Sequence, residues 1–377
     1  MANSPNRDLD GLLVISLEQA VAAPYAASRL ADAGARVIKV ERPEGDFARG
    51  YDADANGYSS YFVWLNRGKE SVALDLKQPG DLKIFKQMLS KADVFIQNLM
   101  PGALDRLGVS MADLRQADPR LITCDISGYG ASGPFAQMKA YDFLVQAEVG
   151  LAQITGAPEE PGRVGVSICD IAAGMTAHAA ILQALVARAK TGEGRAIEVS
   201  LFHALADWMN VPYLQHHYGG REIRRPGLHH PTIAPYGAYR CGDDRMLLIS
   251  IQNEREWLRL CDDVLDQPDL PQNPKFDSNV HRVENRASLD AIMNGVFSQY
   301  SIDKIAEKLQ AAQIAFGRLN DMDVFTQHPQ NRFVSVRTSS GDVQLLSPGA
   351  IVNGILPRLG DVPDLGQHSA AIREEFS

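Results

Sequence analysis

The chain has 377 residues, of which 22% are charged and 45% are hydrophobic, and its formal net charge is −9 at pH 7. This composition is typical of a soluble globular protein, and the length predicts more than one domain. The acidic balance argues against a general binder of nucleic acid or of membrane surfaces, because tracking phosphates requires a basic face. A local group of Arg and Lys could still hold an anionic ligand.

Short apolar runs alternate with helical stretches over the first 200 residues or so. Strands are expected at residues 12–15, 37–40, 72–76, 94–97, 121–126 and 195–200, and helices at 24–33, 81–92, 103–107, 111–115, 171–190 and 201–211. Strands separated by helices of this length predict a parallel, doubly wound sheet. The expected fold class is therefore α/β, with a Rossmann-like large domain.

The pattern changes after residue 214. Residues 215–231 are rich in His, Gly and Arg without a clear period and are expected to form a linker. Strands at 236–239 and 246–251, with helices at 255–264, 287–300 and 302–312, predict a small α+β domain. Strand-like runs at 333–336 and 343–345 predict a return to the large domain. The expected divisions are 1–214, 215–322 and 323–377.

Cysteine usage and the N-terminal sequence indicate the compartment. The four cysteines are far apart and form no CxxC pair: Cys124, Cys169, Cys241 and Cys261. They predict neither a zinc site nor a disulfide framework, which fits the reducing cytoplasm. No basic segment joined to an apolar segment opens the chain, so no signal peptide is expected. The longest weakly polar stretch, Ala177–Ala189, is too short to span a bilayer.

Asp170 follows a run of alternating apolar residues that begins at Arg163, and a helix is expected after it. One interpretation is a helix N-cap, which Asp commonly provides. The other is a carboxylate nucleophile at a strand–helix junction, where backbone N–H groups stabilise negative charge. The residues around Asp170 leave both interpretations open.

Gly128–Gly133 reads GYGASG and matches G-x-G-x-x-G after a predicted strand. A dinucleotide fingerprint must also open a helix and have an acidic residue about 20 positions further on. Here Pro134 follows directly and no amphipathic helix begins. We therefore favour a loop that lets a ligand or a second chain approach the backbone over a nicotinamide site.

Basic side chains recur at the loops of the predicted sheet: Lys39, Arg42, Arg49, Arg67, Lys69, Arg106 and Lys139. Ligands of open α/β sheets bind beyond the strand ends, and phosphate groups require such charges. Ordinary solvated bases are the alternative, and the pattern leaves both open. The histidine pairs 216–217 and 229–230 lack metal-ligand spacing, so no metal site is predicted.

Several segments together carry a family resemblance. They are residues 30–43, 66–69, 98–102, 127–130 and 141–142, and Asp170 with Gly174. With them, the chain from about residue 8 to its end resembles the class III CoA-transferases of the CaiB/BaiF group. The resemblance implies a Rossmann-like large domain, a small domain and an interlocked homodimer. It also implies CoA or acyl-CoA as substrate, with no permanently bound cofactor.

The resemblance implies a role for particular residues. It makes Asp170 the catalytic residue, which we expect to be ionised at neutral pH because the reference pKa of Asp is about 3.9. The residues implied around the CoA nucleotide and its phosphates are Arg42, Lys69, Asn98, Arg106 and Lys139. The residues implied at the acyl substrate are Arg49, Tyr141, Asp142 and Gly130.

A finer resemblance points to the mesaconyl-CoA C1–C4 transferase subgroup, carried by residues 16–24, 45–51, 208–212 and 250–257. It implies that CoA moves between the two carboxylates of one short dicarboxylic acid. Formyl-CoA transferases carry a Gln near Val21 and a glycine run near 252–254, so formyl and oxalyl substrates are not expected.

Other activities stay open. The family's α-methylacyl-CoA racemases place a His beside the Asp equivalent to Asp142, and residues 139–143 of this chain contain no His. Racemisation requires an acid and a base on opposite faces of the α-carbon, so transfer is favoured. The alternatives are a succinyl-CoA-dependent transferase for itaconate, citramalate or malate, and a non-catalytic CoA-binding protein.

Overall fold

The computed structural model of the chain describes residues 8–377 and contains two compact units. Unit 1 comprises the chain up to Leu151, Val164–Gly219 and Arg332–Ser377, and unit 2 comprises Ala152–Arg163 and Gly220–Asn331. The predicted domain boundaries, after residues 214 and 322, lie five and nine residues before those of the structure, which follow Gly219 and Asn331. The inclusion of residues 152–163 in the second unit was not predicted.

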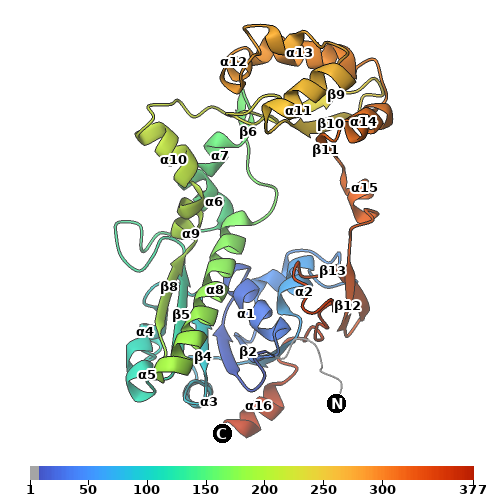
Figure 1. Cartoon of the computed structure of the whole chain (residues 1–377). Helices are drawn as coiled ribbons and strands as arrows, with labels where there is room; N and C mark the ends of the chain where they lie inside the picture. Colours follow the sequence, from blue (N-terminus) through green and yellow to red (C-terminus); the bar gives the residue numbers. More distant parts are fainter. Residues whose placement is uncertain (1–7) are drawn as a thin grey trace. The chain divides into compact units, whose positions relative to one another are not determined.

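Unit 1 is built on a six-stranded parallel sheet with the order β3-β2-β1-β4-β5-β8 (Figure 1). The strands are β1 (Leu13–Leu17), β2 (Arg36–Glu41), β3 (Lys69–Ala73), β4 (Val94–Gln97), β5 (Ile122–Ser127) and β8 (Ala196–Ser200). The chain runs from β1 outward to β2 and β3, then crosses to β4 on the other side of β1. The loops after β1 and β4 therefore diverge, and open α/β sheets bind ligands at such a point. The predicted parallel, doubly wound sheet is confirmed.

Helices cover both faces of this sheet because successive strand residues point to opposite sides. On one face α1 (Ala22–Asp32), α8 (Ile168–Thr191) and α9 (Leu201–Trp208) pack over a core that includes Val14 and Val37. The neighbouring strand residues Ile15 and Ile38 join the opposite core. That core is covered by α3 (Pro79–Leu89), α4 (Ala103–Arg106), α5 (Met111–Ala117) and α16 (Ser369–Glu375).

Helix α8 is the central helix of unit 1 and has 24 residues, three more at its start than predicted. Its length and composition alone would allow it to cross a membrane, as they would for many buried core helices. Its buried side chains, among them Ala173, Ala177 and Ile181, belong to the core shared with α1. A Cβ added to Gly174 would lie only 2.7 Å from the carbonyl oxygen of Ala22, so α1 and α8 approach very closely here.

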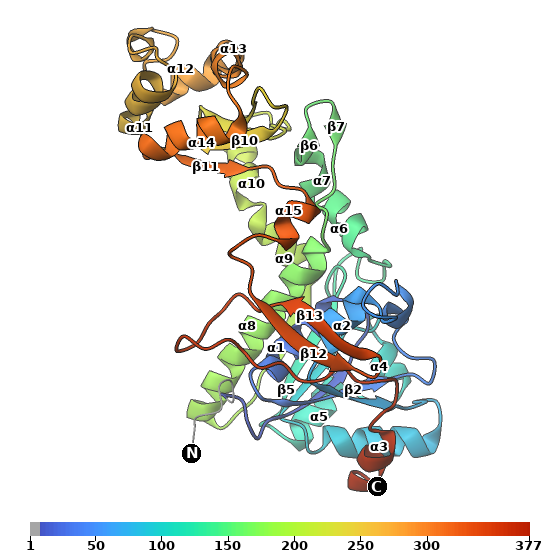
Figure 2. The ribbon, with the colours of Figure 1, turned by 90° about the vertical axis from the view of Figure 1, so that its right-hand side faces the viewer.

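The C-terminal part of the chain returns to unit 1. The antiparallel strands β12 (Phe333–Thr338) and β13 (Gly341–Leu346) are joined by a tight turn (Figure 2). Val336 packs with Phe62 and Val63 of α2 (Ser60–Asn66) in a small apolar cluster. This cluster anchors the segment beside the helix that precedes β3.

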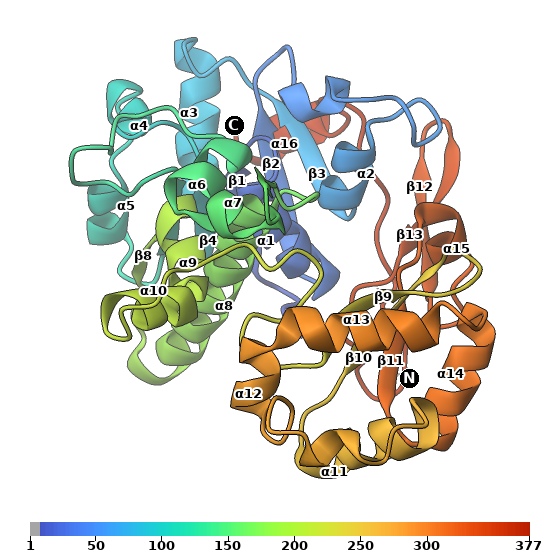
Figure 3. The same cartoon turned by 90° about the horizontal axis from the view of Figure 1, so that it is seen from above.

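Unit 2 has its own core. An antiparallel sheet of order β11-β10-β9 lies beside a group of helices (Figure 3). Its elements are β9 (Tyr236–Arg240), β10 (Met246–Ser250), β11 (Ala315–Arg318), α11 (Glu254–Arg259), α12 (Asn279–Glu284), α13 (Arg286–Phe297) and α14 (Ile302–Ala311). Trp257, Leu247 and Phe297 are fully or almost fully buried at its centre.

The remaining elements are short. They are the 3₁₀ helices Phe47–Gly50 and Leu270–Gln272, the π-helical turn Leu260–Val264, α6 (Asp142–Glu148), α7 (Leu151–Ile154), the paired strands β6 (Gly156–Ala157) and β7 (Glu160–Pro161), α10 (Asn210–His217) and α15 (Met322–Thr326). Two of them, Phe47–Gly50 and α6, border the candidate site. Neither was predicted from the sequence.

Candidate active site

Asp170 lies in the first turn of α8, as the third residue of the helix. Residues 162–167 form bends and loop, so the expected strand leading to Asp170 is absent, and Ser167 is the N-cap. Both sequence interpretations of its position, the strand–helix junction and the N-cap, are therefore wrong. Because α8 leads directly into β8, its N-terminus and Asp170 lie toward the carboxyl edge of the parallel sheet.

Asp142 holds the start of α8 from outside the helix. Its Oδ1 accepts hydrogen bonds from the backbone N–H of Cys169 (2.7 Å) and of Asp170 (3.2 Å). Its Oδ2 accepts from Nε2 of Gln146 (2.7 Å), one turn further along α6. Ser167 makes no capping bond with its side chain, so Asp142 supplies the acceptor that a helix N-terminus requires. Asp142 was predicted at the acyl substrate, but both of its oxygens face donors of the protein.

The electrostatic surroundings of Asp170 oppose its ionisation. Burial and the negative charge of Asp142 raise its pKa to about 7. Both causes penalise the carboxylate, because burial removes water and the neighbour has the same charge. The expectation of an ordinary aspartate is therefore corrected: the pKa of Asp170 lies well above the usual value of an aspartate. Carboxyl groups that titrate in this range are frequent in catalytic sites.

Three tyrosines gather near Asp170, and the sequence identified only Tyr141 among them. Burial and the negative charges of Asp46 and Asp170 raise the pKa of Tyr51 to about 12, so its hydroxyl lies within electrostatic reach of both carboxylates. The rings of Tyr51 and Tyr61 meet edge to face, with centroids 5.6 Å apart. The hydroxyl of Tyr61 lies 3.3 Å from Oγ of Ser167, the N-cap of α8. Tyr141 is 64% exposed and directly precedes Asp142.

Three of the predicted CoA ligands are exposed bases: Arg42, Arg106 and Lys139. None of them forms an ion pair with another residue in the range 8–377. Arg42 donates from Nε to the carbonyl oxygen of Gly45 (2.8 Å). They follow β2, β4 and β5, so all three lie on segments that leave the carboxyl edge of the sheet. Such an arrangement suits the phosphates of an extended ligand.

The other two predicted CoA ligands are used inside the protein. Nζ of Lys69 is fully buried and donates to Oε1 of Glu18 (2.5 Å), to the carbonyl oxygen of Pro24 and to Oδ1 of Asn66. The side-chain amide of Asn98 makes two hydrogen bonds to the backbone of Gln19, one through each of its polar atoms (2.9 and 2.8 Å). The geometry therefore gives no support to Lys69 as a phosphate ligand, and it shows Asn98 as a link between the loops after β4 and β1.

Arg49 and Gly130 were predicted at the acyl substrate. Arg49 forms a two-bond ion pair with the buried Glu41 (2.7 and 2.9 Å), so its guanidinium has a partner within the protein. Gly130 has φ +99°, and its N–H donates to Oγ of Ser127 (3.0 Å). Gly128 packs so closely on Ala140 that an added Cβ would lie 2.2 Å from the Cβ of Ala140. The glycine loop is thus held beside the segment that carries Tyr141.

Comparison with known proteins decides the family. A sequence profile described as CoA-transferase family III matches residues 9–369. This chain belongs to that family. An acetyl-CoA:oxalate CoA-transferase of Acetobacter aceti is 35% identical to it over 99% of this chain and 97% of the relative. The human succinyl-CoA:glutarate CoA-transferase is 32% identical over 98% of this chain and 86% of the relative.

A solved structure of a CaiB/BaiF family protein from Brucella suis has the same architecture. It superimposes with a TM-score of 0.83 at 32% identity, covering 99% of this chain and all of that one. The mixed α/β fold with one large parallel sheet and small antiparallel sheets is therefore the fold of the family. As a family III CoA-transferase, the protein is an enzyme that uses CoA thioesters as substrates.

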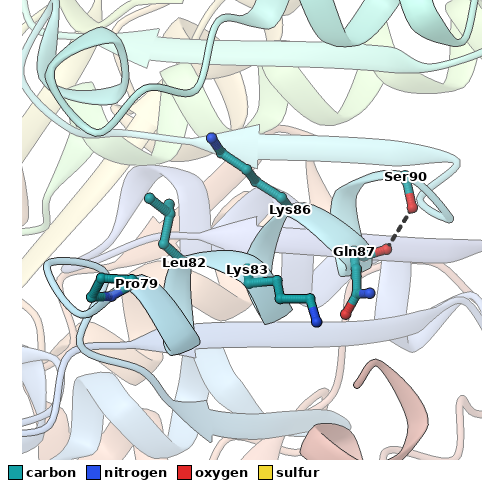
Figure 4. Close-up of a pocket in the computed structure, with 6 residues that line it drawn as sticks. All are labelled: Pro79, Leu82, Lys83, Lys86, Gln87 and Ser90. Atoms are coloured by element: carbon teal, nitrogen blue, oxygen red, sulfur yellow. Dashed lines mark hydrogen bonds between the residues drawn. The ribbon is translucent and has the colours of Figure 1, made fainter.

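Two hollows on unit 1 of this CoA-transferase lie away from Asp170. One of about 430 Å³ follows a face of α3 and is lined by Pro79, Leu82, Lys83, Lys86, Gln87 and Ser90 (Figure 4). The other, of about 250 Å³, includes Asp105, Asp125 and Glu198. Burial and these neighbouring carboxylates raise the pKa of Asp125 to about 6. Neither hollow is lined by Asp170 or by the nearby tyrosines.

Proposed function

We propose that this family III CoA-transferase moves CoA between carboxylates through a covalent intermediate at Asp170. The observation that carries the proposal is the placement of Asp170 in the first turn of α8, beside Asp142 and within electrostatic reach of Tyr51. A carboxylate with a raised pKa is a stronger nucleophile than an ordinary one, and the helix N-terminus favours the negative charge that forms there. No base is required once Asp170 is ionised.

The proposed transfer has two halves. In the first, an oxygen of Asp170 attacks the thioester carbonyl, the C–S bond breaks, and CoA thiolate leaves a mixed anhydride. The thiolate then attacks the Asp170 carbonyl of the anhydride, which releases the first acid as a carboxylate and leaves an aspartyl-CoA thioester. In the second half, a carboxylate of the acceptor attacks this thioester and the same two steps run in reverse. Each step conserves charge and requires no oxidant or reductant.

Tyr51 is proposed to stabilise the negative oxygen that forms during each attack. Its pKa of about 12 keeps the hydroxyl protonated at neutral pH, so it can donate a hydrogen bond to developing charge near Asp170. Arg42, Arg106 and Lys139 are proposed to bind the nucleotide and phosphates of CoA, because they are exposed and free of ion pairs among residues 8–377. Lys69 is left out of this set because it is buried against Glu18.

A short dicarboxylic acid is the proposed acyl group. The two relatives are named for oxalate and glutarate, which are both dicarboxylates. Within this class we propose mesaconyl-CoA with transfer from C1 to C4, because residues 45–51 and 250–257 resemble that subgroup. The second carboxylate belongs to the acid that the first half-reaction releases inside the site, so its effective concentration at the aspartyl-CoA thioester far exceeds that of a free acid in solution. Intermolecular transfer is the second candidate, since both relatives are named for separate donors and acceptors.

One experiment tests both the intermediate and the acyl group. The enzyme is incubated with mesaconyl-C1-CoA and isotope-labelled free mesaconate, the two CoA isomers are separated, and hydroxylamine traps the activated aspartate. We expect the C4 isomer without label and a single modified residue, Asp170. Heavy label in the product would move the assignment to intermolecular transfer. An adduct elsewhere, or an active Asp170→Ala variant with normal folding and CoA binding, would refute the mechanism.

We further propose that the enzyme is a homodimer. Unit 1 exposes a series of large apolar side chains along α9 and α10: Trp208, Val211, Tyr213, Leu214 and Tyr218, which are 49–76% exposed. Large apolar side chains exposed together on neighbouring helices are typical of an interface. Static light scattering should give twice the chain mass of 41.2 kDa, and a folded monomer that persists on dilution would rule the dimer out.

A further inference from the structure

Six charged side chains form a buried cluster beneath the loop that follows β1. They are Glu18, Lys39, Glu41, Asp46, Arg49 and Lys69. The cluster holds three acids and three bases, and the side chains of five members have no exposed surface. Burying so many charges costs free energy that mutual attraction scarcely repays, so a purely stabilising role explains the cluster poorly. It lies at the carboxyl ends of β1 and β2, next to the point where the sheet changes direction.

Lys39 and Lys69 share one carboxylate in this cluster. Oε1 of Glu18 lies 2.5 Å from Nζ of Lys69 and 3.4 Å from Nζ of Lys39. Burial alone would raise the pKa of Glu18, but the two ammonium groups hold it below its usual value. Lys39 also donates to Oδ2 of Asp46 at 2.8 Å. Lys39 therefore fixes the orientation of the Asp46 carboxylate with a charge-assisted hydrogen bond.

Asp46 in turn holds two segments of backbone in place through hydrogen bonds. Its Oδ1 accepts from the N–H of Ala20 (3.1 Å), in the loop after β1, and from the N–H of Ala48 (3.0 Å). The bond to Ala48 caps the 3₁₀ helix Phe47–Gly50, which ends directly before Tyr51. Ala20 has φ +62°, a left-handed conformation that is strained for a residue with a side chain. Asp46 thus holds a strained loop and the base of the segment that carries Tyr51.

Both segments belong to the surroundings of Asp170. The Tyr51 ring contacts Tyr61 at 5.6 Å between centroids, and the Tyr61 hydroxyl lies 3.3 Å from Oγ of Ser167 at the start of α8. The negative charges of Asp46 and Asp170 both reach the Tyr51 hydroxyl. The loop after β1 leads into the first turn of α1, and its residue Ala22 meets α8 at Gly174, one turn after Asp170. The side chain of Asp46 is fully buried, and its carboxylate accepts hydrogen bonds from Ala20, Lys39 and Ala48.

We propose that Asp46, oriented by Lys39, is a positioning residue for the transfer reaction: it sets Tyr51 and the loop Gln19–Val21 relative to Asp170. The inference rests on the proposed function, because it concerns the geometry of that reaction. A misplacement of reacting groups by about 1 Å can cost ~100-fold in rate, which is the scale of effect to look for.

The test compares three variants of the full-length enzyme. Asp46→Ala removes every acceptor, and Asp46→Asn keeps an oxygen for Ala20 and Ala48 but loses the charge opposite Lys39. The matched control is Asp32→Asn, which breaks another largely buried ion pair of unit 1, between Asp32 and Arg67 (2.5 Å). Asp32 contacts neither the loop after β1 nor the 3₁₀ helix. All three variants should lose stability, but only the Asp46 variants should lose catalysis beyond that.

We expect kcat to fall at least ~10-fold in Asp46→Ala and less in Asp46→Asn, while the Kd of CoA changes less than ~3-fold. Tyr51→Phe combined with Asp46→Ala should be less harmful than the product of the single effects, because both act on one group. Hydrogen exchange should speed up in peptides covering residues 18–25 and 46–52 in Asp46→Ala and stay unchanged there in Asp32→Asn.

Distinct results separate the two proposals. A wild-type enzyme that transfers CoA while Asp46→Ala matches the Asp32→Asn control would overturn the positioning role alone. The same holds if CoA binding weakens as much as kcat falls, or if exchange rises equally throughout unit 1. A wild-type enzyme without any transfer would instead refute the proposed function.

Discussion

Two groups of carboxylates in unit 1 lie in similar surroundings and behave in opposite ways. In the buried cluster Glu18 is paired with Lys39 and Lys69, and its pKa is held below the usual value. Burial raises the pKa of Glu41, but Arg49 and Lys39 outweigh this and hold it at about 2. At the start of α8, burial and Asp142 raise the pKa of Asp170 to about 7.

The difference lies in the partner that each carboxylate meets. Each acid of the cluster faces a cation, so its negative charge is neutralised where water is absent. Asp170 faces another carboxylate, and Asp142 is stabilised by backbone N–H groups that are not full charges. A paired carboxylate holds a structure together, whereas an unpaired one keeps its reactivity. The contrast makes three predictions.

The largest effect is expected from breaking a pair in the cluster. Lys69→Met should lower the free energy of unfolding at pH 7 by about 3–5 kcal/mol, because Glu18 keeps only the hydroxyl of Ser16 and the more distant cation of Lys39 at 3.4 Å. Urea unfolding followed by circular dichroism measures this. The control is Glu375→Gln, which breaks an exposed pair with Arg36 and should cost less than ~1 kcal/mol. Equal losses of stability in the two variants would mean that breaking a buried ion pair costs no more than breaking an exposed one.

At Asp170, the carboxylate that faces another carboxylate, a substitution is expected to raise stability and not to lower it. Asp170 has a folded-state pKa of about 7, above its value in the unfolded chain, so the folded state binds more protons and ionisation costs stability as pH rises from about 4 to 7. Asp170→Asn removes this cost. It should stabilise the enzyme by at most about 4 kcal/mol, and by less where water reaches the carboxyl. Thermal unfolding at pH 5.5 and 8.5 should show the larger gain at pH 8.5, and a gain independent of pH would contradict the raised pKa.

The smallest of the three effects is expected from a change of Asp142, the carboxylate beside Asp170. Asp142→Asn keeps an oxygen for the N–H groups of Cys169 and Asp170 but removes the negative charge. The pKa of Asp170 should therefore fall below about 7, and the rise of kcat/KM with pH should move to lower pH by up to about one unit. Profiles of kcat/KM from pH 5 to 9 measure this. Glu148→Gln, at the exposed end of the same helix α6, should leave the profile where it is.

The sequence predicted the sheet well because its strands are apolar and separated by helices. All six strands of the large sheet were expected, and five lie within two residues of their predicted positions at each end. The exception is β3, expected at 72–76 and found at Lys69–Ala73. Its first two residues are charged, and charged residues usually lie outside buried strands. Lys69 is tolerated there because Glu18 meets it, and a contact across 51 positions cannot be inferred from local pattern.

The candidate site was predicted in outline and not in its contacts. Strand ends located Asn98 and the basic residues, but the sequence does not state which way a side chain points. Asn98 turns to the backbone of Gln19, 79 positions away. Tyr51 and Tyr61 were missed because they lie in or beside short elements without a periodic pattern. The one available signal was the resemblance carried by residues 45–51, which ends on Tyr51.

Gly174 limits which positions of this enzyme can be changed to give it a new acid substrate. A Cβ there would lie 2.7 Å from the carbonyl oxygen of Ala22 and 2.8 Å from Cβ of Tyr25, so even alanine would push α1 and α8 apart. That displacement would carry Asp170 with its helix. Tyr141 is 64% exposed, and replacing it would change the proposed surroundings of the acyl group without disturbing the helix pair. A combinatorial library should therefore diversify Tyr141, and leave Gly174 and the proposed oxyanion donor Tyr51 unchanged.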